Sequence, residues 1–200
     1  MKNRTAQIKR KTKETDIAIK LNIDGTGKAC IDTGIGFLDH MLELFAYHGL
    51  FDLKVKAKGD LDVDTHHTNE DIGIALGQAF KKALKSKKGI NRFGQSFVPM
   101  DEALSRARVV LDISSRPSLY FDNKIKWLKA TKTYDLNDCE ELLKAFTLNS
   151  GVNMHVDIIR GKDTHHVLES VFKALGRALS EAARVEPRRG KRIPSTKGRL

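Results

Sequence analysis

Polar and apolar residues alternate along residues 16–24, where Ile17, Ile19, Leu21 and Ile23 occupy every second position. A period of two predicts a strand with one buried face. Residues 37–47 instead space their apolar side chains three and four positions apart, which predicts an amphipathic helix. The same two tests, applied to the rest of the first ninety residues, predict further strands at about 5–11, 28–32 and 53–59 and a long helix at about 65–85.

The second half of the chain repeats this order of patterns. Its periodicities predict strands near 95–99, 106–113, 118–122 and 152–159, with helices at about 138–149 and 164–184. Within the first half, the DGTG sequence at 24–27 is typical of a tight turn and predicts that the strands on either side form a hairpin.

These patterns predict an α+β fold made of two βββαβα half-domains. Because the outward strand positions are polar, each half should be a four-stranded sheet with two helices on one face. The two halves would then pack helices against helices. We expect the first half-domain at residues 1–90, the second at 91–186, and a C-terminal substrate-binding tail at 187–200.

Each half carries an HHxxE motif at the start of its last predicted helix. In the first copy, His66 and Glu70 lie four positions apart on one helix face, while His67 points about 100° away around the axis. The second copy consists of His165, His166 and Glu169. Imidazole and carboxylate ligands suit Mn, Fe or Zn, so the motif predicts a divalent metal site with ligands directed toward two ions.

The two motifs lie inside an internal duplication, which makes a chance arrangement of histidines less plausible. His165 and Glu169 each follow their first-half equivalents by 99 positions, and small changes of offset elsewhere fall in predicted loops. The same repeat places His40, in GFLDHM, opposite Glu141, in DCEELL. Both are metal-compatible side chains, so they join the candidate ligands.

Composition and charge narrow the choice of partners. The chain has 200 residues, a net charge of +11 and two cysteines without CxxC spacing. Such a charge favours an anionic partner, yet no zinc finger, RNP-like strand or helix-turn-helix pattern supports nucleic-acid binding. No apolar run of about 18 residues predicts a membrane span, and the charged N-terminal sequence is unlike a signal peptide. We therefore expect a cytoplasmic protein that binds neither nucleic acid nor membrane.

Several ordered motifs resemble the imidazoleglycerol-phosphate dehydratase family of histidine biosynthesis, in its monofunctional form. They cover nearly the whole chain: GFLDHM (36–41), THHTNED (65–71), INRFGQ (90–95), PMDEAL (99–104), DTHHVLES (163–170), FKALGRAL (172–179) and PSTKG (194–198).

The resemblance implies a duplicated fold, two Mn²⁺ ions per active site and a large homo-oligomer, a 24-mer built from trimers with active sites at subunit interfaces. It also makes a set of side chains metal ligands: His40, His66, His67, Glu70, Glu141, His165, His166 and Glu169. Glu141 departs from the expected pattern, because many members have histidine there. A carboxylate can take the same coordination position.

The implied reaction removes water from imidazoleglycerol phosphate to give imidazole acetol phosphate. The proton that must leave is on a carbon without an adjacent carbonyl group, so a base alone would form an unstabilised carbanion. Metal coordination favours the imidazolate form of the substrate ring, which can expel the neighbouring hydroxyl and form a diazafulvene-like intermediate. By resemblance, Glu14 is the general acid–base residue; Asp101 and Glu102 are the repeat-related alternatives.

The family resemblance also implies a set of residues that hold the substrate phosphate: Arg92, Arg116, Lys173, Ser195 and Lys197. Helix geometry supports Lys173, which follows His166 by two turns and so lies roughly 10 Å from it. Two other functions stay open on the sequence alone. One is another His/Glu di-metal enzyme, such as a hydrolase, acting on a phosphorylated small molecule. The other is a basic, non-catalytic nucleic-acid-binding protein with structural histidines.

Overall fold

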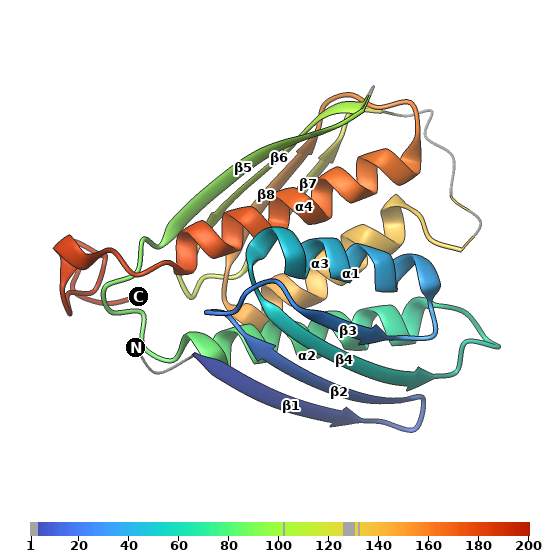
Figure 1. The fold of residues 1–200 in the computed structure, drawn as a ribbon, viewed down its shortest axis with the longest axis horizontal. Coiled ribbons are helices and arrows are strands. Elements are labelled where there is room, and N and C mark those ends of the chain that lie inside the picture. Colours follow the sequence, from blue (N-terminus) through green and yellow to red (C-terminus); the bar gives the residue numbers. More distant parts are fainter. Residues whose placement is uncertain (1–3, 102, 126–130, 132) are drawn as a thin grey trace.

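Two four-stranded sheets enclose a layer of four helices (Figure 1). The structure is a computed structural model and describes residues 4–101, 103–125, 131 and 133–200. The strands are β1 (Thr5–Lys11), β2 (Thr15–Asn22), β3 (Ala29–Asp32), β4 (Asp52–Gly59), β5 (Phe93–Met100), β6 (Ala103–Asp112), β7 (Ser118–Asn123) and β8 (Asn153–Ile158). The helices are α1 (Gly36–Gly49), α2 (His66–Leu84), α3 (Leu136–Ser150), α4 (Thr164–Ala183) and the short 3₁₀ helix η1 (Pro187–Arg189).

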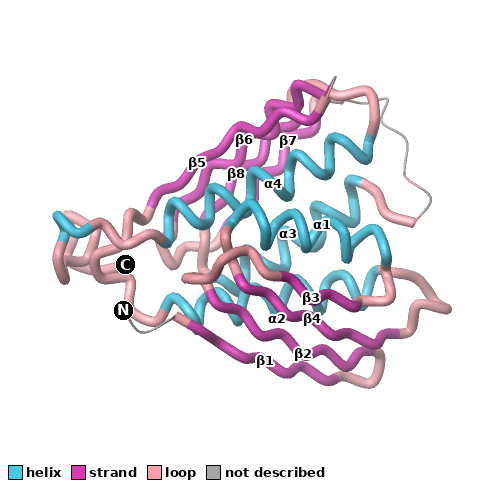
Figure 2. The backbone as a smooth tube through the Cα atoms, in the orientation of Figure 1, coloured by secondary structure: helices cyan, strands magenta, loops and turns pink. Residues whose placement is uncertain are grey.

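The two sheets have the same topology, which confirms the predicted α+β duplication. Their strand orders are β1-β2-β4-β3 and β5-β6-β8-β7. In each sheet the third strand pairs parallel to the fourth, and the remaining pairs are antiparallel. Figure 2 shows the strands of the two sheets as outer layers and the helices between them.

The predicted β2–β3 hairpin is wrong, because β3 pairs with β4 rather than with β2. The loop after β2 crosses the start of β4, where Asp52 Oδ1 accepts hydrogen bonds from the backbone N–H groups of Thr26 and Lys28 at 2.8 and 3.3 Å. A Cβ at Gly25 would lie 2.3 Å from the Asp52 nitrogen, so glycine permits this crossing. The DGTG sequence therefore directs the chain past a neighbouring strand instead of reversing it.

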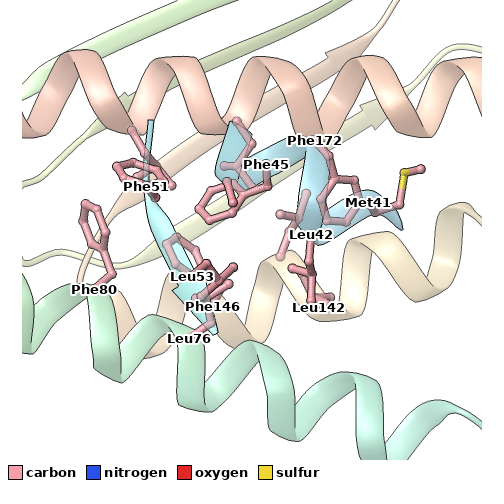
Figure 3. Packing of buried hydrophobic residues seen from close by; sticks show 14 of the residues in the cluster. Met41, Leu42, Phe45, Phe51, Leu53, Leu76, Phe80, Leu142, Phe146 and Phe172 are labelled. Carbon is pink, nitrogen blue, oxygen red and sulfur yellow. The ribbon is translucent and has the colours of Figure 1, made fainter. Parts of the chain in front are cut away.

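The apolar faces of all four helices meet in a continuous core between the sheets. α2 packs on α3 and α1 packs on α4, so each helix pair joins the two halves. Five phenylalanine side chains, which come from both halves, are at most 1% exposed and are labelled in Figure 3: Phe45, Phe51, Phe80, Phe146 and Phe172. The ring centroids of Phe45 and Phe51 are 5.2 Å apart, and those of Phe80 and Phe146 are 6.0 Å apart. Burial of this apolar surface is the main stabilising contribution to the fold.

The helix arrangement sets where functional side chains can gather. The N-terminal ends of α1 to α4 all lie toward one end of the molecule, at the right in Figure 1, and the C-terminal segment lies at the other. That segment is bonded to the chain between α2 and β5, where the two halves join: Gly89 N–H donates to the Arg192 carbonyl at 2.8 Å, and Arg92 Nη1 donates to the Pro194 carbonyl at 2.9 Å. Within the described residues, no helix is long and apolar enough to cross a membrane.

Candidate metal centre and anion pocket

His40, His165 and Glu169 meet at the contact between α1 and α4. Their candidate ligand atoms all lie within 4.8 Å of one another. Glu169 Oε1 is 3.1 Å from His40 Nε2 and 3.0 Å from His165 Nε2. Asp163 caps α4 by accepting hydrogen bonds from the His165 and His166 backbone N–H groups, which fixes where the HHxxE motif begins on the helix.

The Glu169 carboxylate is held in its ionised form by the cation beside it. Lys173 Nζ donates a 2.6 Å hydrogen bond to Glu169 Oε2, and the two side chains are only 12% and 9% exposed. Burial acts to raise the pKa of Glu169, but hydrogen bonds from Lys173, His40 and His165 outweigh it and lower the pKa to about 2. The carboxylate is therefore ionised at neutral pH, the form in which it could bind a cation.

Two imidazoles and one carboxylate with converging ligand atoms fit a divalent transition metal. Among the described residues, no other group of three His, Cys, Asp or Glu side chains brings its ligand atoms this close. The predicted ligands His66, Glu70 and Glu141 thus do not form a second cluster of this kind in a single chain. Glu141, on α3, instead lies 3.4 Å from Lys144 Nζ.

His67, at the start of α2, is oriented by carboxylates from two loops. Its Nδ1 lies 2.9 Å from Asp60 Oδ2 and 3.9 Å from Glu14 Oε2. The hydrogen bond with Asp60 raises the pKa of His67, and the nearby charge of Glu14 adds to the effect. When Nδ1 carries the proton and donates to Asp60, Nε2 keeps its lone pair for a ligand.

The second half has a comparable contact. His166 Nε2 lies 3.9 Å from Asp101 Oδ2, the same distance as Glu14 Oε2 from His67, but the ring nitrogen that faces the carboxylate is Nε2 here and Nδ1 in His67. In each HHxxE copy the two adjacent rings are 6.1 Å apart and steeply inclined, at 72° and 80°. Glu102, the other alternative base, lies outside the described residues.

Four of the five predicted phosphate-binding residues line one cavity of about 430 Å³. They are Arg92, Arg116, Ser195 and Lys197, and the same cavity is lined by Ser114, Ser115, Thr196, Arg199 and Leu200. Asp112 holds the Arg92 guanidinium through hydrogen bonds of 2.6 and 2.9 Å. Guanidinium, ammonium and hydroxyl groups in one concave site suit a phosphate. The fifth residue, Lys173, lies instead beside Glu169.

The metal cluster and this anion pocket lie near opposite ends of α4. His165 is at its first turn, whereas the Arg92 N–H donates to the carbonyl of Ala182 in its last turn. At 1.5 Å per residue, these two positions are about 25 Å apart. A substrate with a three-carbon chain cannot reach both sites of one chain.

Several residues of these two sites were not predicted from the sequence. Asp60 lies in the acidic loop GDLDVD, where nothing distinguishes it from Asp62 or Asp64 until its contact with His67 is known. Arg199 and Thr196 could have been nominated by their place within or beside PSTKG. Ser114 and Ser115 could have been nominated by their place before Arg116.

Comparison with known proteins assigns the chain to one family. Residues 33–179 match the sequence pattern of the imidazoleglycerol-phosphate dehydratase family. The imidazoleglycerol-phosphate dehydratase of Thermoanaerobacter pseudethanolicus is 57% identical over 98% of this chain and 100% of its own length. That of Methylorubrum extorquens is 52% identical with the same coverage.

Two solved structures of such enzymes are also similar. The Staphylococcus aureus enzyme has a TM-score of 0.79 and 40% sequence identity, covering 91% of this chain and 99% of its own. The Pyrococcus furiosus enzyme, solved in complex with (S)-C348, has a TM-score of 0.81 and 35% identity, covering 96% and 100%. Sequence motifs, duplicated fold and similarity along almost the whole chain agree: this protein belongs to the imidazoleglycerol-phosphate dehydratase family.

Proposed function

We propose that this protein is a hydro-lyase that converts imidazoleglycerol phosphate to imidazole acetol phosphate and water in histidine biosynthesis. Its family membership supports the reaction and the substrate. The observation that carries the proposal is the convergence of His40, His165 and Glu169, because this reaction needs an electrophile at the imidazole end of the substrate. We expect it to act in the cytoplasm, where the free thiols of Cys30 and Cys139 stay reduced.

The proposed cofactor is Mn²⁺, with two ions per active site. His40, His165 and Glu169 would hold one ion, and His66, His67, Glu70, Glu141 and His166 would complete the ligand sets at subunit contacts. A bound ion would supply Lewis acidity, which would favour the imidazolate form of the substrate ring and so departure of the neighbouring hydroxyl.

Glu14 is the proposed general base. Its carboxylate is about half exposed, and it lies 3.9 Å from His67, so it can reach a substrate bound beside the histidines. An ionised carboxylate can accept the carbon-bound proton once the hydroxyl has left, and the resulting enol becomes the ketone product. Asp101, whose carboxylate lies 3.9 Å from His166 Nε2 in the second half, is the alternative base.

The anion pocket is proposed to bind the substrate phosphate. Arg92, Arg116 and Lys197 supply positive charge, Ser195 supplies a hydroxyl, and the segment 187–200 acts as a substrate-binding tail. Lys173 would contact the same phosphate from the metal side, since it lies one helix turn beyond Glu169.

The separation of the two sites supports a homo-oligomer with shared active sites. If one substrate must contact both, the metal cluster of one chain and the anion pocket of another must meet at a subunit interface. A 24-mer built from trimers is the assembly that the family resemblance implies. Co-assembly of two impaired variants, Glu169→Gln with an altered metal cluster and Lys197→Ala with a raised KM, tests this sharing at a substrate concentration far below the raised KM. Active sites should reappear, up to about one quarter of the total, because some combine an intact cluster with an intact pocket.

The reaction itself is tested with purified protein, Mn²⁺ and imidazoleglycerol phosphate, by following the ketone product and inorganic phosphate separately. Ketone formation with phosphate retained is the expected result. Release of phosphate without ketone would support the alternative, a His/Glu di-metal hydrolase. Absence of recovered activity in the co-assembled variants would reject site sharing without rejecting the reaction.

A further inference from the structure

The turn between β1 and β2, which carries Glu14, is bonded to helix α2 through Asp71. Thr15 Oγ1 donates a 2.5 Å hydrogen bond to Asp71 Oδ2, and Arg10 Nε donates a 2.7 Å hydrogen bond to Asp71 Oδ1. Asp71 and Thr15 are only 6% and 3% exposed. Both oxygens of a buried carboxylate therefore hold the two strands on either side of this turn.

Helix geometry connects this anchor to the histidines. Asp71 follows His67 by four positions, so both side chains lie on one face of α2, about 6 Å apart along its axis. Thr15 contacts the Asp71 turn of the helix, and the preceding residue Glu14 faces the His67 turn at 3.9 Å. Adjacent residues of the β-turn thus contact successive turns of the helix that carries candidate metal ligands.

The side chain of Thr12 stabilises the turn locally. Thr12 Oγ1 accepts hydrogen bonds from the Glu14 N–H at 3.1 Å and from the Thr15 N–H at 2.9 Å. The backbone of Glu14 is therefore fixed relative to Thr15, and Thr15 is fixed relative to Asp71. Displacing Thr15 would carry Glu14 with it.

In the second half, the position equivalent to Asp71 is not a carboxylate. The residue that corresponds to Asp71 is Ser170, whose hydroxyl donates to the Val98 carbonyl at 2.9 Å. A serine hydroxyl cannot form the ion pair that Asp71 makes with Arg10. Asp101 and Glu14 lie equally far from their histidines. The ion pair between Arg10 and Asp71, however, holds the turn that carries Glu14.

We propose that Thr15 and Asp71 are positioning residues that hold the Glu14 carboxylate in place for proton transfer. The inference rests on the proposed function, in which Glu14 is the base. Neither residue needs to touch the substrate. Their effect is on the position of Glu14, and a displacement of about 1 Å at a reacting group can cost up to about 10²-fold in rate.

Thr15→Val tests the proposal, because it removes the hydroxyl and keeps the shape of the side chain. In the assembled Mn²⁺ enzyme, kcat should fall about 10- to 100-fold while KM and bound Mn²⁺ stay within about twofold. Thr15→Ser, which restores the hydroxyl, should recover most of the loss. Thr5→Val, at the exposed far end of the same strand pair, is the matched control and should leave kcat unchanged.

A double variant separates positioning from general stability. If Thr15 acts through Glu14, then Glu14→Gln with Thr15→Val should be no slower than Glu14→Gln alone. Losses that multiply, or a Thr15→Val enzyme with normal kcat, would overturn the positioning role and leave the base assignment intact. A near-normal kcat in Glu14→Gln alone would reject the base itself. If Thr15→Val does not assemble, Asp71→Asn is measured in its place, with the same expected fall in kcat and the same double-variant comparison.

Discussion

Glu169 uses its two carboxylate oxygens for different neighbours. Oε2 accepts from Lys173, whereas Oε1 faces His40 and His165. The position equivalent to Lys173 in the first half is Ile74, so the repeat does not reproduce this cation. The two helix-end motifs are therefore chemically different, although their ligand residues are the same.

At the residue scale, Glu14→Gln should separate catalysis from metal binding. Glutamine keeps the size of the side chain but cannot accept the proton, so kcat should fall by about 10²–10⁴-fold. Metal content, measured by elemental analysis of the assembled protein, should be unchanged. If activity persists, the same measurement on Asp101→Asn tests the alternative base.

Asp60→Asn should weaken metal binding through His67. The carboxylate accepts the Nδ1 proton and keeps Nε2 free, and loss of such an outer partner typically costs about 10- to 100-fold in metal affinity. Titration of demetallated protein with Mn²⁺ measures the change. Asp62→Asn, which alters an exposed carboxylate of the same loop, is the control, and equal affinities in the two variants would contradict the orienting role.

The site residues that could be predicted from the sequence are those whose residue type and spacing already indicate metal binding. The HHxxE spacing and the repeat nominated His40, His165 and Glu169 before their ligand atoms were known to converge. Asp60 and Asp71 could not be found this way, because an ordinary aspartate gains a role only from the side chain that it meets in space. Their partners lie 7 and 56 positions away in the sequence.

At the element scale, α1 and α4 approach so closely that a glycine is required between them. A Cβ on Gly176 would lie 2.4 Å from the Phe45 carbonyl oxygen. Gly176→Ala should therefore separate the helices, destabilise the fold by about 1–3 kcal/mol and weaken Mn²⁺ binding, since His40 and Glu169 lie on opposite sides of this contact. Gly36→Ala, where a Cβ meets nothing within 4 Å, is the control for thermal unfolding and Mn²⁺ titration.

The C-terminal segment should be needed for substrate affinity and not for metal binding. Truncation after Ile193 removes Ser195 and Lys197 from the anion pocket, so KM should rise strongly while Mn²⁺ content is unchanged. Lys191→Ala removes a charge just before this stretch and controls for general electrostatics. An unchanged KM after truncation would mean that the segment is dispensable, as polar termini often are.

The elements themselves were predictable because their periodicities are clear. Within the described residues, each of the eight strands and four long helices overlaps a range predicted from the sequence, with ends that differ by a few residues. The β2–β3 hairpin was predicted wrongly, because a DGTG sequence can either reverse the chain or lead it past a neighbouring strand. The carboxylate of Asp52 accepts hydrogen bonds from the backbone N–H groups of Thr26 and Lys28, and these bonds decide between the two paths. Asp52 lies more than twenty positions further along the sequence.

At the scale of the whole molecule, metal removal should act on assembly as well as on activity. If the ligands are shared between chains, as proposed, they bind the ion only in the assembled state, and metal binding would stabilise that state by linkage. Chelation with EDTA should abolish activity and shift the particle toward smaller oligomers, and Mn²⁺ should reverse both changes. Light scattering that shows the same particle size throughout would separate assembly from metal binding.

The placement of the two sites at opposite ends of α4 would affect how enzyme activity depends on the concentration of the protein. If active sites are shared as proposed, α4 contributes its first turn to one site and its last turn to another, and the isolated chain has no complete site. Near the concentration at which subunits associate, catalytic output would then rise more steeply than the number of chains synthesised. Halving expression would cost more than half of the flux, and dilution alone would inactivate protein whose every residue is intact.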